Sequence, residues 1–242
     1  MSDKEINALL MERYTALQSP FGRWKLNAYA RAKRFSWRCA IFSAEFIKRF
    51  VDIVFSLVAL VLLAPVFALV ALLIKLEDGG PIFFEQRRVG KWGREFKMYK
   101  FRSMCVDAEQ KLQAILAKNK HVTGVTFKAH DDPRITRVGR WLRKFSIDEF
   151  PQFYNVLAGD MSLVGPRPPV PREVAIYSPA DRRRLEVKPG LTCFWQIGGR
   201  SEIDFPEQVL LDVQYIESQS IWLDVKILFK TVPAVLFGRG AC

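Results

Sequence analysis

The adjacent carboxylates Asp148 and Glu149 are the residues of this chain whose types and setting most suggest chemistry. Ser146 and Asp148 are suitable helix N-caps, Glu149 has capping-box spacing from Ser146, and Pro151 is tolerated in a first helical turn. We therefore predict that a helix begins near Asp148. The dipole of that helix would keep the carboxylate ionised and would attract phosphate oxygens, so the pattern indicates a site for a phosphate ester.

Two arginines near this pair support the prediction of a phosphate site. Arg143 and Arg167 are the nearest arginines on either side, and a guanidinium suits bidentate contact with a diphosphate. An ionised aspartate at an anion site is a candidate nucleophile on phosphorus, which makes Asp148 the candidate catalytic residue. Glu149, beside Asp148, is the candidate ligand for Mg²⁺, which relieves repulsion between carboxylate and phosphate. A pair of solvated carboxylates on a helix surface is the alternative interpretation.

The apolar run at residues 53–74 contains no charge and is long enough for a spanning helix. Pro65 interrupts it, however, and a proline inside a helix removes a backbone hydrogen bond and bends the helix. Basic residues flank the run on both sides, which draws both ends to the cytoplasm. We therefore predict a broken, re-entrant helix that enters and leaves one face of the membrane. A proline-kinked helix that spans the membrane is the alternative.

The predicted fold class is α/β and membrane-associated: mostly helical with a small β-hairpin, and with amphipathic helices at the membrane interface. Residues 1–44 form a basic amphipathic arm that lies on an anionic membrane surface, with a solvated or disordered tail as the alternative. Residues 45–78 form the kinked membrane helix, and residues 79–242 form a cytoplasmic catalytic domain. The elements expected in that domain are a hairpin at 82–101 around the glycine-bounded loop 90–93, helices at 106–118, 134–144, 205–218 and 221–237, and a polar loop at 119–132.

The net charge of +12 implies an anionic partner, which could be nucleic acid, anionic lipid or a phosphorylated substrate. The four cysteines form no CxxC pair and the two histidines have no ligand spacing, which disfavours a disulfide framework or a zinc site. A non-enzymatic, membrane-anchored module that binds nucleic acid or a polyanionic polymer is the alternative function. No helix-turn-helix or RNA-binding signature supports that module, and it gives Asp148 and Glu149 no role.

Four motifs, at residues 132–140, 146–152, 159–168 and 188–192, follow the proline-interrupted segment in an order that resembles the bacterial sugar transferase family, the small monotopic phosphoglycosyl transferases. The resemblance covers about residues 50–235. It implies transfer of a sugar-1-phosphate from a uridine diphosphate (UDP) sugar to undecaprenyl phosphate, with release of uridine monophosphate (UMP). It also implies a phospho-sugar ester on Asp148, with Mg²⁺ assisted by Glu149.

The same resemblance implies roles for other residues. Arg143 and Arg167 would hold the donor phosphates, and the further candidates for substrate binding are Lys100, Arg102 and Arg200. The family's re-entrant helix is kinked at a proline, which here corresponds to Pro65. The implied location is the cytoplasmic face of the bacterial inner membrane, where the enzyme starts a polysaccharide or glycoconjugate. Membrane lipid and the glycosyltransferases that act on its product are candidate partners, and nucleic acid is not expected.

Three departures from the family pattern are visible. Ala64 precedes the proline, where relatives often have a small hydroxylated residue. Cys193 follows residues 188–192, where relatives usually have glycine, and we expect this change to affect a turn more than the chemistry. The chain also lacks the large multi-span N-terminal half of the longer members, so we expect a minimal form.

Overall fold

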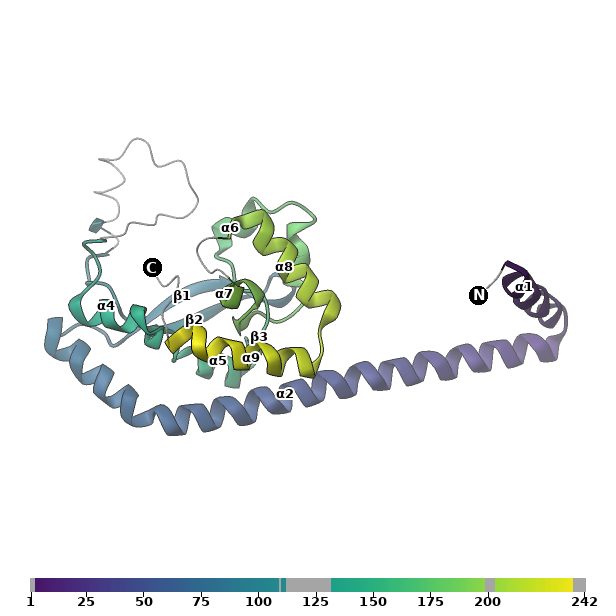
Figure 1. The fold of residues 1–242 in the computed structure, drawn as a ribbon, viewed down its shortest axis with the longest axis horizontal. Helices are drawn as coiled ribbons and strands as arrows, with labels where there is room; N and C mark the ends of the chain where they lie inside the picture. Colours follow the sequence, from purple (N-terminus) through teal and green to yellow (C-terminus); the bar gives the residue numbers. More distant parts are fainter. Residues whose placement is uncertain (1–2, 109, 112–131, 199–202, 237–242) are drawn as a thin grey trace. The chain divides into compact units, whose positions relative to one another are not determined.

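The computed structural model describes residues 3–108, 110–111, 132–198 and 203–236. The chain divides into two compact units, Met1–Lys48 and Arg49–Cys242. Helix α1 (Asp3–Gln18) and the beginning of α2 (Pro20–Asp78) make up the first unit, into which the predicted arm 1–44 falls. The second unit contains the rest of α2 and all the elements that follow (Figure 1).

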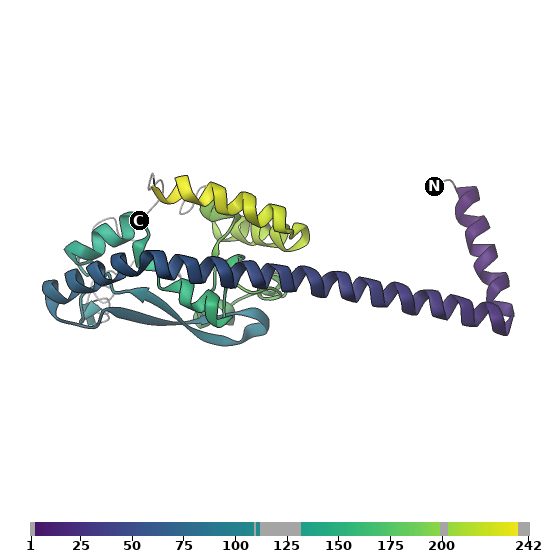
Figure 2. The same ribbon diagram turned by 90° about the horizontal axis from the view of Figure 1, so that it is seen from below.

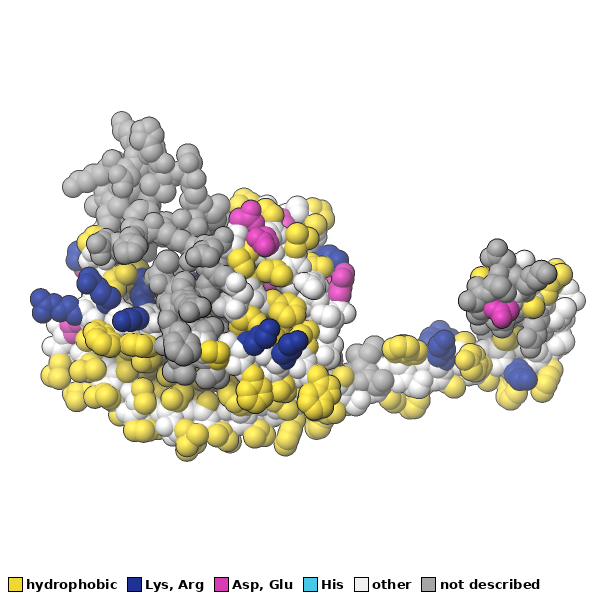
Figure 3. Space-filling model, in the orientation of Figure 1, with side chains coloured by type: hydrophobic (Ala, Val, Ile, Leu, Met, Phe, Trp, Pro, Cys, Tyr) yellow, Lys and Arg dark blue, Asp and Glu magenta, His cyan; other side chains and the backbone are white. Residues whose placement is uncertain are grey.

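Helix α2 contains the whole apolar run and is long and apolar enough, by length and composition, to cross a membrane. It continues through Pro65 to Asp78, and Figure 1 shows its part in the second unit curving as one helix. The predicted break is therefore a bend, because the turns on either side of the proline keep their hydrogen bonds. Hydrophobic side chains cover this edge of the unit (Figure 3), and those more than half exposed include Val61, Leu62, Leu69 and Leu76.

The predicted hairpin is confirmed. Strands β1 (Phe83–Val89) and β2 (Glu95–Phe101) pair antiparallel around the turn η1 (Lys91–Gly93). In this register Gln86 lies opposite Met98 and Arg88 opposite Phe96. Directly opposite residues share a face of the sheet, and Met98 and Phe96 are buried, so Arg88 belongs to the inner face.

The elements after the hairpin partly match the expectations. Helix α4 (Arg137–Lys144) begins three residues later than predicted, because the Thr136 hydroxyl accepts a hydrogen bond from the backbone N–H of Gly139 and caps it there. The helices predicted at 205–218 and 221–237 are confirmed as α8 (Phe205–Ser218) and α9 (Ile221–Leu236). The predicted helix 106–118 and loop 119–132 lie largely outside the described residues. The remaining elements are η2 (Ile147–Glu149), α5 (Gln152–Ala158), β3 (Ser162–Val164), α6 (Pro171–Ala175), η3 (Asp181–Leu185), β4 (Gly190–Thr192) and α7 (Phe194–Gly198).

Two buried clusters join these elements. The larger, which includes Val156, Met161 and Leu163, connects β2, α5 and β3 with α8 and α9. The smaller one packs Ile74 of α2 and Leu142 of α4 against the end of β2. A short parallel pair, β3 with β4, was not predicted. Seen from below, the part of α2 in the second unit lies in front, with the hairpin on one side of it and α9 on the other (Figure 2).

A polar stripe attaches α2 to the second unit. Arg49, Asp52 and Ser56 recur at helical spacing, and their buried members interrupt an otherwise apolar helix. Arg49 donates hydrogen bonds of 2.6 and 2.7 Å to the carbonyls of Val156 and Leu157 at the end of α5. Asp52 accepts hydrogen bonds from a hydroxyl and a backbone N–H of β3. The helix is thus fixed to the elements that follow the carboxylate pair.

A buried ion pair holds α8 to η3. Asp212 is 1% exposed, and its Oδ2 lies 2.7 Å from Nη2 of Arg184, which is 5% exposed. Burial raises the pKa of Asp212 from 3.8 to about 6, and Arg184 opposes this increase only in part.

We expect this group to make stability fall as the pH rises from about 4 to 6. In that window the folded chain keeps the Asp212 proton that the unfolded chain has released, which lowers the unfolding free energy by roughly 3 kcal/mol in total. Asp212→Asn should therefore flatten the pH dependence of the thermal unfolding midpoint in detergent. In Glu207→Gln, a change at an exposed acid of the same helix, the midpoint should depend on pH as steeply as in the wild type. If the midpoint of Asp212→Asn also falls as steeply with pH, Asp212 is not the group responsible.

Candidate active site

The carboxylate pair lies in the 3₁₀ turn η2, not at the start of an α-helix. Ser146 precedes this turn in the left-handed conformation (φ 54°), and its side chain makes no capping hydrogen bond. The predicted capping box is therefore wrong, since a capping side chain requires an extended backbone at that residue. Helix α5 starts at Gln152 with Pro151 as its N-cap. The turn places Asp148 and Glu149 immediately before the N-terminus of α5.

The two carboxylates have different environments. Asp148 is buried, and this burial raises its pKa to about 6, with Lys100 opposing the effect. Burial also acts against the charge of Glu149, but Lys100 and then Arg167 outweigh it and lower its pKa to about 2. The Lys100 ammonium lies 2.7 Å from Oε1 of Glu149. The sequence predicted that the helix dipole would keep Asp148 ionised, but burial, which favours the neutral acid, has the largest effect on its pKa. With a pKa of about 6, Asp148 is still mostly ionised at neutral pH.

Divergent pKa values within one carboxylate pair are typical of groups with separate roles. Glu149 is ionised and forms an ion pair with Lys100. Asp148 keeps its charge with less stabilisation from neighbours, which leaves its oxygens more basic and more nucleophilic. Because Glu149 is paired with Lys100 and Asp148 has the higher pKa, Asp148 is the better candidate for a nucleophile.

A pocket beside Glu149 brings together segments far apart in the sequence. It lies among β1, β2, η2, α5, β4, α7 and the segment after β3. Three of its lining side chains are cations and one is a carboxylate, which leaves an excess of two positive charges. Such an excess in a partly buried site fits a ligand with two or more negative charges. The lining residues are Arg88, Met98, Lys100, Glu149, Gln152, Arg167, Pro168, Gly190, Leu191 and Gln196.

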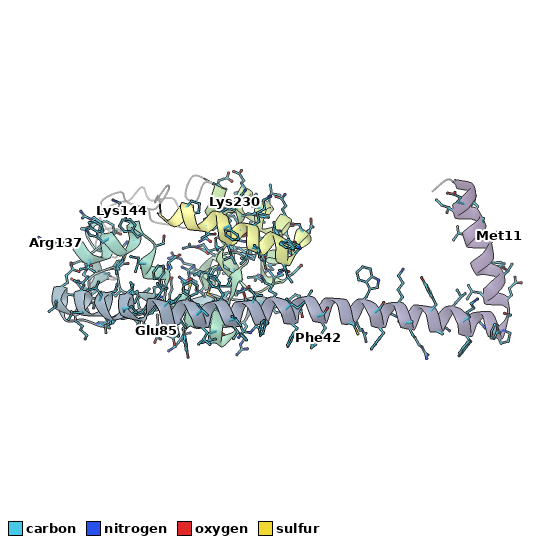
Figure 4. All side chains as sticks on the ribbon, turned by 60° about the horizontal axis from the view of Figure 1, so that its bottom comes forward. Met11, Phe42, Glu85, Arg137, Lys144 and Lys230 are labelled. Carbon is cyan, nitrogen blue, oxygen red and sulfur yellow. The ribbon has the colours of Figure 1, made fainter. Side chains whose placement is uncertain are left out.

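Two of the predicted binding residues, Lys100 and Arg167, line this pocket. The Arg167 guanidinium also lies over the ring of Trp195, 6.0 Å from its centroid, which orients it. Arg143, in the last turn of α4, is close enough to Asp148 to lower its pKa. Figure 4 shows the cations Arg137 and Lys144 on the same helix, as predicted for a helix that presents positive charge.

The remaining predicted site residues are Arg102, Arg200 and Pro65. Arg102 is buried and pairs with Asp78 at the end of α2, so its charge is already matched there. Arg200 lies outside the described residues. Pro65 lies inside α2, as described above. The assignment of Arg102 and Arg200 to substrate binding stays a prediction.

Arg88 was missed by sequence reasoning. It is 8% exposed, donates to the Pro168 carbonyl at 2.8 Å, and donates from Nε and Nη2 to Oε1 of Gln86. Burial, followed by the nearby Arg167, lowers its pKa to about 10, so it stays cationic at neutral pH. The hairpin sequence could have revealed the position of Arg88. The alternating residues Phe96 and Met98 mark the inner face of the hairpin, and pairing across the turn puts Arg88 on that face.

No group of three or more His, Cys, Asp or Glu side chains placed to hold a metal ion occurs in the part of the chain that the structure describes. This does not exclude Mg²⁺, which keeps several waters and commonly uses one or two protein carboxylates together with substrate phosphates. The donor set of Asp148 and Glu149 fits that requirement. Lys100 now occupies one oxygen of Glu149.

Comparisons with known proteins identify the family of this chain. The profile of the family described as bacterial sugar transferase matches residues 43–238. This chain therefore belongs to the bacterial sugar transferase family.

Three relatives illustrate the similarity. The galactosyl transferase CpsE of Streptococcus agalactiae is 53% identical over 195 residues, covering 80% of this chain and 43% of the relative. The exopolysaccharide production protein ExoY of Sinorhizobium fredii is 43% identical and is covered over 87% of its length, with 80% of this chain matched. The undecaprenyl-phosphate galactose phosphotransferase of Salmonella typhimurium is 43% identical, with 82% of this chain and 42% of the relative covered. The chain thus spans less than half of two of these relatives and most of the third.

Proposed function

We propose that this protein is a phosphoglycosyl transferase that moves a sugar-1-phosphate from a UDP-sugar to undecaprenyl phosphate. The observation that carries the proposal is the buried, weakly stabilised Asp148 beside a pocket with an excess of positive charge. Relatives named for phosphotransfer to undecaprenyl phosphate support the choice of acceptor. Relatives named for exopolysaccharide production support a role in starting a polysaccharide.

The reaction has two displacements at one phosphorus. First, a carboxylate oxygen of Asp148 bonds to the phosphorus that carries the sugar, and the bond from that phosphorus to the bridging oxygen breaks, which releases UMP. Second, a phosphate oxygen of undecaprenyl phosphate bonds to the same phosphorus, and the bond to Asp148 breaks. The carboxylate is regenerated, and no further reactant is needed.

The cations of the pocket bind the donor in this scheme. Arg167 and Arg88 contact the diphosphate, and a planar guanidinium can make two parallel hydrogen bonds to it. Lys100 adds a third positive charge to the pocket. Arg143 of α4 adds a positive charge near Asp148. Mg²⁺, held by Glu149 and Asp148 with the donor phosphates, would offset phosphate charge. The non-enzymatic alternative explains the net charge but not the buried carboxylates.

The membrane is the second partner in the proposal. The apolar part of α2 would enter the inner membrane from the cytoplasmic face and return to it, since its flanks are basic on both sides. Helix α9 exposes Trp222 and Phe229 beside Lys226 and Lys230, a composition suited to the interface between lipid and water. The acceptor's phosphate would then meet Asp148 near the membrane surface.

The activity can be tested with purified protein, undecaprenyl phosphate and a panel of UDP-sugars. We expect release of UMP from one or a few of these donors, and only when Mg²⁺ is present. Labelled donor should also leave the sugar phosphate on the protein when the acceptor is omitted. Salt-sensitive nucleic-acid binding without any UMP release would instead support the non-enzymatic alternative.

Membrane topology gives an independent prediction. In a background without native cysteines, Phe50→Cys and Leu76→Cys place thiols at exposed positions near the two ends of the apolar run. Both should react with a membrane-impermeant maleimide only from the cytoplasmic side of oriented vesicles. Labelling from opposite sides would show that α2 spans the membrane and that the re-entrant proposal is wrong.

A further inference from the structure

The last turn of α2 is bonded to two of the segments that carry cations of the candidate site. The carboxylate of Glu77 accepts hydrogen bonds from the backbone N–H groups of Arg137, at 2.7 Å, and Val138, at 3.3 Å, in the first turn of α4. The next residue, Asp78, forms an ion pair with Arg102, which directly follows β2. Figure 1 shows this end of α2 beside α4. The end of the apolar helix therefore holds both α4 and the end of β2.

Glu77 caps α4 from a distant part of the chain. The first four backbone N–H groups of a helix have no partner within the helix, and an acidic group near them also interacts favourably with the helix dipole. The Thr136 hydroxyl accepts a hydrogen bond from one of these groups, the N–H of Gly139, and Glu77 supplies the acceptor for two others. Because Glu77 precedes Arg137 by 60 residues, this cap ties the position of α4 to that of α2.

A close backbone contact limits how α4 can respond to loss of this cap. A Cβ at Gly139 would lie 2.0 Å from the carbonyl oxygen of Ser103, so the two backbones touch. The same oxygen accepts a hydrogen bond of 3.2 Å from the N–H of Thr136. Without the Glu77 acceptor, we expect α4 to tilt about this contact. Arg143 lies about 6 Å beyond Gly139 along the helix axis, so a tilt of ~10° displaces it by ~1 Å.

Arg143 is the residue of α4 whose displacement would affect the candidate site. It lies near enough to Asp148 to lower the pKa of that carboxyl. Its carbonyl also accepts a hydrogen bond of 3.2 Å from the N–H of Ser146, which precedes the carboxylate turn. We propose that Glu77 is a positioning residue, which caps α4 from the end of α2 and thereby places Arg143 to hold the donor's phosphates. Glu77 itself does not touch the substrate, and the inference rests on the proposed function.

The test measures kcat/KM for the UDP-sugar from which wild-type protein releases UMP fastest, with undecaprenyl phosphate and Mg²⁺ present. Glu77→Ala removes both hydrogen bonds to α4, and we expect it to lower kcat/KM by roughly tenfold, since a displacement of ~1 Å can cost up to about 100-fold. Glu77→Gln keeps an acceptor oxygen and should stay within about twofold of wild type. If Glu77→Gln is as impaired as Glu77→Ala, the hydrogen bonds to α4 are not responsible and the inference is wrong.

Asp204→Ala is the matched control, because it removes a cap of the same kind from α8. The Asp204 carboxylate accepts a hydrogen bond of 3.0 Å from the N–H of Glu207. Loss of either cap should lower the thermal unfolding midpoint by a few degrees, but only Glu77→Ala should lower kcat/KM. Equal losses of activity in the two variants would overturn the inference, because reduced stability would then explain both.

A double-mutant cycle tests whether Glu77 acts through Arg143. Arg143→Ala leaves the three cations of the pocket in place, so its activity should remain measurable. In that background Glu77→Ala should lower kcat/KM further by less than about twofold, because the guanidinium that Glu77 positions is absent. A further loss of about tenfold there, or full activity of Glu77→Ala alone, would overturn the inference. Absence of UMP release from wild-type protein is a different result, and it would refute the proposed function itself.

Discussion

Asp148→Asn should abolish turnover of the donor sugar. The amide is a poor nucleophile, so we expect UMP release to fall by a factor on the order of 10⁴ or more, as for other covalent catalysts that lose their nucleophile. The protein should also no longer become labelled by donor sugar phosphate when the acceptor is absent. The measurements are UMP release under saturating donor and intact-protein mass spectrometry.

Two further variants make this prediction specific. Glu149→Gln removes the partner of Lys100 but leaves the nucleophile, so covalent labelling should be slow but detectable. Glu85→Gln, at an exposed acid of β1 labelled in Figure 4, changes the charge by the same amount far from the carboxylate turn in sequence and should retain activity. Normal turnover by Asp148→Asn would disprove its role as nucleophile.

Gly190→Ala should damage both stability and activity. A Cβ at Gly190 would lie 2.0 Å from the backbone nitrogen of Gly165, which belongs to the neighbouring segment. Those two backbones are held together by hydrogen bonds, from Gly190 N–H to the Pro166 carbonyl and from Gly165 N–H to the Thr192 carbonyl. The added methyl group must push the segment that carries Arg167 away from β4.

We expect this strain to cost about 1–3 kcal/mol of unfolding free energy, and to lower the thermal midpoint by roughly 2–12 °C. Displacement of Arg167 by about 1 Å should lower kcat/KM by roughly 100-fold. Gly198→Ala is the matched control, because a Cβ there meets no heavy atom within 4 Å. Equal midpoints and activities for the two variants would show that the close approach at Gly190 is not needed for the site.

The sequence by itself determined the elements whose signals are local. The hairpin followed from two apolar strands around a glycine-bounded turn, and α8 and α9 followed from helical spacing. The role proposed for Asp148 and Glu149 came from their residue types and from motifs that resemble a family, and the chain does belong to that family. These properties depend on neighbours within a few residues or on the order of motifs, and both are readable along the chain.

Only the tertiary structure decided the rest. Arg88 joins the pocket because of the hairpin register and the carbonyl of Pro168, while Arg102 pairs with Asp78. The helix expected at Asp148 became a 3₁₀ turn after the left-handed Ser146. These outcomes depend on backbone conformation and on partners distant in sequence, which local propensity does not specify.

The burial of the two carboxylates could not be predicted from the sequence either. The difference in pKa between Asp148 and Glu149 arises because burial outweighs the attraction of Lys100 and Arg143 at Asp148, whereas at Glu149 the ion pair with Lys100 at 2.7 Å, together with Arg167, outweighs burial. The attachment of α2 through Arg49 likewise joins residues more than 100 positions apart. The residue types of the candidate site were thus readable from the sequence, and packing decided which carboxylate is paired with Lys100 and which has the raised pKa, because desolvation depends on the whole fold.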